Sequence, residues 1–310
     1  MKFIYSIISI LFITAIFSCD KIDNPYPPSE EVDTSGIVWD DSVKAKSNEG
    51  VRYVLMEEYT GHKCTNCPRG AKAIEDLKAG YGDKFIPIAT HIIDAFAAPG
   101  DIGGPAGSYT SDYRTDEGLV YETTFNIAGL PGGTVSRRNF PVVTDGVWGE
   151  EAQEIYRDPG PTVANLHLTA FYDQSKGTYR VRVIVEWLID YTDGLNLQVQ
   201  MLEDSIADWQ LDNGQHIPPF DPATQTGYMH RHMFRGSVNT VWGEPMKDAA
   251  AVNDMDTMIY TREFDPPSVK FPEGRSIKDK DVSFVAFLYK DASDGYEVMQ
   301  VNEVHLMNHP

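Results

Sequence analysis

Residues 51–82 read VRYVLMEEYTGHKCTNCPRGAKAIEDLKAGYG. Their first part, Val51 to Tyr59, is rich in β-branched and aromatic residues and predicts a strand. A short turn leads to Cys64-Thr65-Asn66-Cys67, and beyond Pro68 the apolar residues recur at helical spacing. Unpaired backbone N–H groups and the dipole at a helix start stabilise a thiolate. The stretch therefore predicts a reactive dithiol where a strand passes into a helix.

Other uses of a Cys-x-x-Cys motif fit this sequence less well. A c-type haem site needs a histidine after the second cysteine, where this chain has Pro68. A structural zinc site needs further ligands at matching spacing, and the chain has no second cysteine pair. An inert disulfide stays open as an alternative, although so small a loop gains little stability from closure. We therefore favour a redox role, without a metal or other cofactor.

His62 and Lys63 lie directly before the first cysteine of the pair. A cation at either position would favour the thiolate and would also face a partner. The alternative is that both are solvated loop residues, and the sequence leaves the two interpretations open.

The chain continues as an alternating α/β unit. Residues 85–93 predict a second strand, parallel to the first through a right-handed crossover, and residues 111–124 predict a helix. The run Phe125–Pro131 then resembles the stretch of the thioredoxin superfamily that leads into a cis-proline facing the dithiol. The resemblance implies that Pro131 is cis and that the backbone at Leu130 hydrogen-bonds an extended partner.

Glu58 lies six residues before Cys64, where thioredoxins often keep a buried acid. By this resemblance Glu58 would have a raised pKa and would exchange protons with the thiol of Cys67. Because Glu57 and Glu58 point to opposite faces of a strand, we expect one of them to face inward, and the resemblance selects Glu58. The chain departs from the family at Gly132, since threonine is common after the proline.

The amino-terminal residues predict export and lipidation. Residues 1–18 combine an early lysine with an apolar run, which is typical of a signal peptide, and Cys19 follows as a lipidation site. An uncleaved anchor or a secreted protein with a chance cysteine are the alternatives. Residues 19–49 are polar and rich in proline, which favours a flexible tether.

The net charge of −20 makes nucleic acid an unsuitable partner, because binding to nucleic acid depends on neutralising phosphates with Lys and Arg. Of the three cysteines, one is assigned to lipid, which leaves a single pair in a compartment outside the reducing cytosol.

Residues 159–310 predict an all-β antiparallel sandwich. Apolar and polar residues alternate in 179–187 and in 195–201, and two further strands are expected near 282–289 and 297–306. His230 and His232 are predicted to share one strand face, but no further ligand completes a metal site.

Over its length the chain resembles the outer membrane protein 28-related lipoproteins of Bacteroidota. The resemblance covers nearly everything after the tether. It implies a lipid-anchored location at the outer membrane, on either the periplasmic or the surface face. It also implies a thioredoxin-like domain at 50–158 followed by the sandwich domain at 159–310. The features that carry the resemblance are Cys19, the run 57–61 leading to Cys64–Pro68, the run 125–131 and the carboxy-terminal strand pair.

Two functions remain in competition. The first is a thiol-disulfide oxidoreductase whose partners are protein thiols or disulfides of the cell envelope. The second is a binding or adhesion lipoprotein, in which the sandwich contacts a partner and the thioredoxin-like unit is an inert scaffold. A fold does not choose between them, because function belongs to sites.

Overall fold

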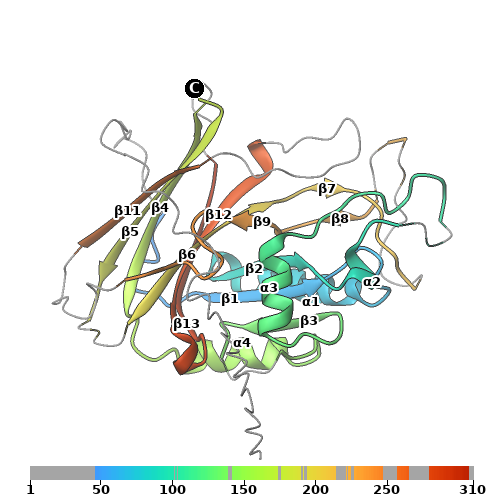
Figure 1. The fold of residues 1–310 in the computed structure, drawn as a ribbon. Helices are drawn as coiled ribbons and strands as arrows, with labels where there is room; N and C mark the ends of the chain where they lie inside the picture. The colour runs from blue at the N-terminus through green and yellow to red at the C-terminus, as the bar shows by residue number, and fades with distance from the viewer. Residues whose placement is uncertain are drawn as a thin grey trace, which may run out of the picture. The chain divides into compact units, whose positions relative to one another are not determined.

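Figure 1 shows the computed structural model of the chain, which describes residues 46–306 except 101, 103, 139–141, 174–175, 190, 192–193, 214–220, 222, 225–226, 247–256 and 265–278. For residues 257–264 only the backbone is described. The predicted signal peptide 1–18, the lipidation site Cys19 and most of the tether 19–49 lie outside these residues. The elements in chain order are β1 (Val54–Thr60), α1 (Cys67–Tyr81), η1 (Gly82–Lys84), β2 (Phe85–His91), α2 (Asp94–Ala97), α3 (Asp116–Thr124), β3 (Gly132–Val135), α4 (Trp148–Arg157), β4 (Ala164–Asp173), β5 (Thr178–Trp187), β6 (Leu195–Glu203), β7 (Ile206–Ala207), β8 (Met229–His230), β9 (Met233–Ser237), β10 (Glu244–Pro245), β11 (Thr257–Phe264), η3 (Asp279–Asp281), β12 (Val282–Lys290), η4 (Ala292–Asp294) and β13 (Val298–His305).

The protein is mostly β, with a mixed main sheet and few helices. The strand order of this sheet is β13-β12-β6-β9-β2-β1-β3, and β10 pairs with β6. The β1–β2 and β2–β9 pairs are parallel, and the other pairs are antiparallel. The sequence predicts an α/β unit and then a β-sandwich, yet strands from both sides of residue 158 share this one sheet. The two halves of the chain are joined in this sheet where β2 meets β9. There the Ala89 N–H of β2 donates a hydrogen bond to the His232 carbonyl at 2.8 Å.

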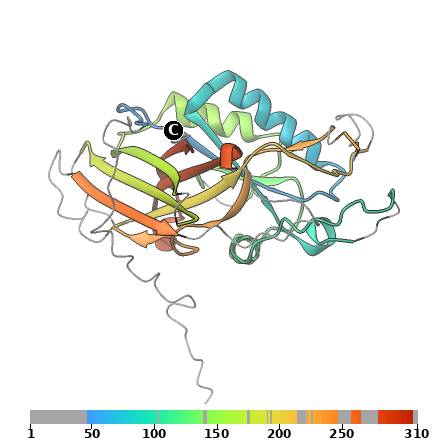
Figure 2. The same ribbon diagram turned by 90° about the horizontal axis from the view of Figure 1, so that it is seen from above.

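Strand β1 lies inside the sheet between β2 and β3, and all of its residues are buried. Figure 2 shows α1 and α4 side by side on one face of the sheet, with α3 on the opposite face. Ile74 of α1 and Trp148 of α4 belong to the same buried cluster as Met56. Because both faces of β1 are covered, Glu57 and Glu58 are both buried, although the strand pattern predicts that only one of them faces inward.

The predicted strands and helices of the first half are present, with shifted ends. The strand expected at 51–59 is β1, that at 85–93 is β2, and a helix begins at Cys67. The helix expected over 111–124 starts only at Asp116, because the side chain of Thr115 accepts a hydrogen bond from the Gly118 N–H and caps the helix.

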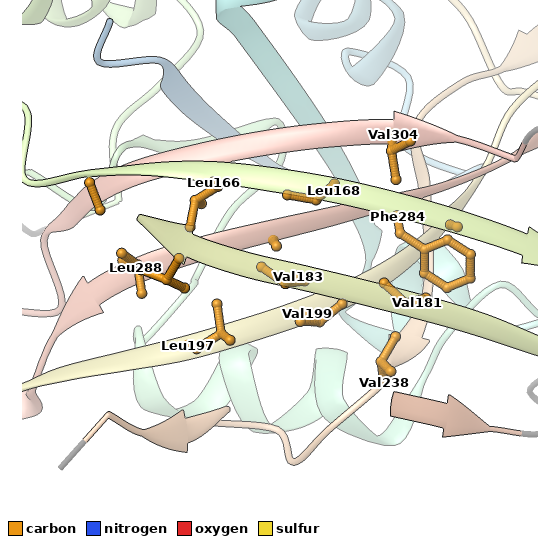
Figure 3. Packing of buried hydrophobic residues seen from close by; sticks show 14 of the residues in the cluster. Leu166, Leu168, Val181, Val183, Leu197, Val199, Val238, Phe284, Leu288 and Val304 are labelled. Atoms are coloured by element: carbon orange, nitrogen blue, oxygen red, sulfur yellow. The ribbon is translucent and has the colours of Figure 1, made fainter. Parts of the chain in front are cut away.

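The second half has its own core, shown in Figure 3. A three-stranded sheet, with the order β11-β5-β4, contributes alternate side chains such as Val181 and Val183. They pack against alternate side chains of β6, such as Leu197 and Val199, and against β12 and β13. The alternating strands predicted at 179–187 and 195–201 are confirmed.

Candidate functional site

The two cysteines of the motif form a disulfide at the start of α1. Cys67 is the first residue of the helix, and Cys64 lies in the preceding loop, with a Cα–Cα distance of 5.4 Å between them. Cys64 is 2% exposed and Cys67 is 1% exposed. The disulfide is therefore shielded from solvent, whereas a redox-active first cysteine is expected to be partly exposed.

A segment from the second half, residues 208–211, docks on the loop that carries Cys64. The Gln210 side-chain amide donates to the carbonyl of Cys64 at 3.0 Å and to that of Gly61 at 3.3 Å. The Leu211 N–H donates to the carbonyl of His62 at 2.7 Å. A partner that approaches from this side has to displace the docked segment.

Glu58 lies on the α1 face of β1, behind the first helical turn. Burial raises the pKa of its carboxyl to about 8, and the charge of Asp145 adds to the shift. A Cβ atom placed on Gly70 of α1 would lie 2.8 Å from Glu58 Oε1 and 2.9 Å from the Cβ of Pro131. The missing side chain at Gly70 thus makes room for the carboxyl and the proline together. A carboxyl with this pKa both donates and accepts protons near neutral pH.

Pro131 is buried, and its peptide bond to the half-buried Leu130 is cis. Strand β3 follows directly, and its antiparallel register pairs Gly133 with Glu58. A Cβ on Gly133 would lie 2.5 Å from the side chain of Met56 and 3.0 Å from that of Trp148. This crowding explains why position 133 is a glycine.

His62 and Lys63 occupy different environments. His62 is 1% exposed, and burial lowers its pKa to about 4, helped by the nearby His230 and Lys63. Its ring is therefore uncharged at neutral pH and lies inside the molecule, not on a surface that a partner meets. Lys63 is half-buried, and its backbone N–H donates to the carbonyl of Phe96.

Three histidines gather around Tyr113 at this end of the sheet. The ring centroids of His62, His91 and His230 lie 5.8, 5.2 and 5.3 Å from the centroid of Tyr113. The Tyr113 hydroxyl donates to the carboxylate of Asp208. Within the described residues, no group of three or more His, Cys, Asp or Glu side chains is placed to hold a metal ion.

Sequence reasoning missed His91 and Gln210, and it misplaced His232. β8 ends at His230, and His232 has a φ of +52°, so the two histidines do not share a strand face. The predicted pair of parallel strands was a sequence signal for His91, because it places the end of the second strand beside the end of the first. In the structure His91 is paired with Thr60, just before the cysteine loop. Gln210 gives no such signal, since it reaches the loop from 146 residues away.

The sequence matches the family described as Outer membrane protein Omp28 over residues 119–309, and the chain belongs to this family. The matched region begins after the disulfide and includes Pro131. No curated protein matches the sequence. Within the described part of the chain, no helix is long and apolar enough to cross a membrane.

Two solved structures from Porphyromonas gingivalis are similar to this chain. HBP35 of Porphyromonas gingivalis has 17% identity and a TM-score of 0.58, over 82% of this chain and 75% of that one. A domain of the outer membrane lipoprotein Omp28, also from Porphyromonas gingivalis, has 23% identity and a TM-score of 0.30, over 47% of this chain and 88% of that one. At these identities the similarity to HBP35 concerns the fold alone.

Proposed function

We propose that the protein is a thiol-disulfide oxidoreductase of the cell envelope. In this proposal residues 50–158 form a thioredoxin-like unit, and residues 159–310 form a β-sandwich that extends its sheet. One observation carries the proposal: the Glu58 carboxyl, Gly70 and Pro131 converge behind the helical turn that begins at Cys67. An inert disulfide has no use for a buried proton-exchanging group at that position.

The exchange reaction uses these residues in turn. In the reduced protein, the Cys64 thiolate attacks a partner disulfide, which releases one partner sulfur as a thiolate and forms a mixed disulfide. Cys67 loses its proton to the Glu58 carboxylate and attacks Cys64 Sγ. The second partner sulfur then leaves and takes up a proton. The partner gains two electrons, the Cys64–Cys67 disulfide forms, and an external dithiol has to reduce it again.

The partner would bind where the cis-proline meets the cysteine loop. In this proposal the backbone at Leu130 pairs with an extended segment of a protein thiol or disulfide, and Lys63 lies at the edge of the same surface. The docked segment 208–211 would move aside first, because its hydrogen bonds occupy the carbonyls of the cysteine loop.

The test is the reduction of insulin disulfides by dithiothreitol in the presence of the purified protein. The wild type is expected to accelerate the reaction at least about tenfold, and Cys64→Ser is expected to abolish the acceleration. Cys67→Ser should accumulate a mixed disulfide with the substrate. Gln210→Ala should react faster than the wild type by about thirtyfold, since it loses two hydrogen bonds to the cysteine loop and each lowers the cost of opening by about 1 kcal/mol. Gln153→Ala, on the exposed face of α4, is its matched control.

The shielded disulfide is the observation that favours the second function, a binding lipoprotein on an inert scaffold. Absence of acceleration in both the wild type and Gln210→Ala would support that function and overturn the oxidoreductase.

We also propose that the protein is held at the outer membrane through a lipid on Cys19. The membership of the Omp28 family supports this location, and the signal-like residues 1–18 support the lipid. Cys19→Ser is expected to move the protein from the membrane fraction to the soluble fraction of cells. Retention of the variant in the membrane fraction would contradict the lipid anchor.

A further inference from the structure

A pocket of about 90 Å³ lies beside Glu58, between α1, β1, β2 and residues 228–232. Glu58 and His91 both line it, and Pro68 and Ala71 of α1 form part of its wall. A cavity needs only about 10–15 Å³ to hold a water molecule, so this pocket has room for several.

Buried polar atoms in the pocket have no hydrogen-bond partner within the described protein. These atoms include Glu58 Oε1 and both ring nitrogens of His91. Glu58 and His91 are each 3% exposed. Buried polar groups are nearly always satisfied, and in a polar pocket of this size water is the available partner. The pocket therefore suits a short chain of water molecules between the carboxyl and the imidazole.

The pocket also reaches solvent. Lys72, Glu75 and Arg231 line it, and their side chains are more than half exposed. Glu75 and Arg231 lie 3.7 Å apart across the opening. The pocket thus runs from exposed charged side chains to the carboxyl behind the disulfide.

We propose that this pocket is a proton path, in which His91 relays protons between solvent and the Glu58 carboxyl while the disulfide opens and closes. The inference rests on the proposed function, because it concerns the proton that disulfide exchange transfers. A neutral imidazole suits the relay, since one ring nitrogen accepts a proton while the other donates one. Burial holds the pKa of His91 well below its usual value, with His230, His62 and Arg235 adding to the effect, so the ring is neutral.

Reduction of the Cys64–Cys67 disulfide shows which proton the path has to deliver. A thiolate of dithiothreitol attacks Cys64 Sγ, the Cys64–Cys67 bond breaks, and Cys67 leaves with the proton of the Glu58 carboxyl. The second thiol of the reagent, as a thiolate, then displaces Cys64 from the mixed disulfide, so the reagent is oxidised and the protein gains two electrons. The Glu58 carboxylate, left charged in a buried place, takes its next proton from the pocket.

Several charged or titratable groups besides His91 face Glu58, and they contribute to the pH dependence. They are Lys72 and Glu75 of α1, Asp145 before α4, and Tyr228, His230, Arg231 and His232 of the opposite wall.

The experiment follows the reduction of the Cys64–Cys67 disulfide by dithiothreitol in the purified protein between pH 6 and 9. His91→Phe keeps a ring against Tyr113 but cannot pass a proton, and it is expected to slow reduction about tenfold at pH 7. Imidazole buffer should restore much of the rate, which a structural defect alone would not allow. His167→Phe, on β4 and outside the pocket, is the matched control and should keep the wild-type rate.

A second variant protects the test against misfolding of the first. Ala71→Leu fills the pocket without removing a titratable group, and it should slow reduction equally, without rescue by imidazole. Wild-type rates in both variants would overturn the proton path. If reduction of the disulfide is slow in both variants but the wild type does not accelerate insulin reduction, the proton path is upheld and only the oxidoreductase function is overturned. A disulfide inert to dithiothreitol in every variant would overturn both.

Discussion

Arg137→Met is expected to destabilise the protein by about 3–5 kcal/mol, because it leaves the Glu57 carboxylate buried without its counter-charge. Arg137 is 1% exposed and Glu57 is 3% exposed. The guanidinium donates to both carboxylate oxygens, at 2.6 and 2.7 Å, and Thr134 donates to the same carboxylate at 3.1 Å. Burial alone would lower the pKa of Arg137, but the adjacent carboxylate raises it overall, so the arginine stays charged.

Aromatic rings around the guanidinium add to this effect. Its central carbon lies 5.0 Å from the ring centroid of Phe287, 5.1 Å from that of Tyr289 and 5.4 Å from that of Phe125. Cation–π attraction is stronger at a desolvated site than at an exposed one. Phe125 lies at the end of α3, and Phe287 and Tyr289 lie on β12. The arginine therefore joins β1 to elements of both halves of the chain.

The measurement is urea unfolding at pH 7, with two matched variants. Lys72→Met removes a pair with Asp76 in which both side chains are exposed, 58% for Lys72 and 67% for Asp76, so the cost should stay below about 1 kcal/mol. The double variant Glu57→Leu/Arg137→Met replaces the pair with apolar groups and should recover most of the lost stability. Equal losses in Arg137→Met and Lys72→Met would contradict the role given to burial.

The Glu57–Arg137 pair also shows where sequence reasoning ends. The strand, the cysteine motif and the following helix depend on neighbouring residues, so periodicity predicts them well. The ion pair joins residues 80 positions apart, and Gln210 contacts the cysteine loop from the other half of the chain. No local pattern encodes such contacts. The burial of both glutamates likewise depends on α3 covering the second face of β1, which the alternation of the strand does not reveal.

The division of the chain shows the same limit. Strand patterns within 159–310 are clear from alternation, but β9 is short and adds to β2 through a single paired position, Ala89 with Met233. That pairing extends one sheet across both halves. Alternation reports which residues of a strand face a core; it does not report which strand lies beside it.

Glu58→Gln is expected to stabilise the protein at pH 8 by several kcal/mol and to leave it unchanged near pH 4. In the folded protein the pKa of Glu58 is about 8, compared with 4.5 for an ordinary glutamate. Between these values the unfolded chain releases a proton that the folded protein retains, so the wild type loses stability as the pH rises from about 4.5 to 8. One pKa unit corresponds to about 1.4 kcal/mol, which makes about 4–5 kcal/mol the upper limit. Glutamine does not ionise and avoids this loss.

The check is the difference in unfolding free energy between Glu58→Gln and the wild type, measured by urea unfolding from pH 4 to 8. Glu75→Gln changes an exposed glutamate of α1 and should give a difference near zero throughout. A difference that stays constant with pH would mean that the buried carboxyl does not hold its proton. If the difference grows as expected while disulfide exchange slows in the same variant, the acid is kept at a cost in stability. Such a cost is characteristic of a group retained for its chemistry, and not for the fold.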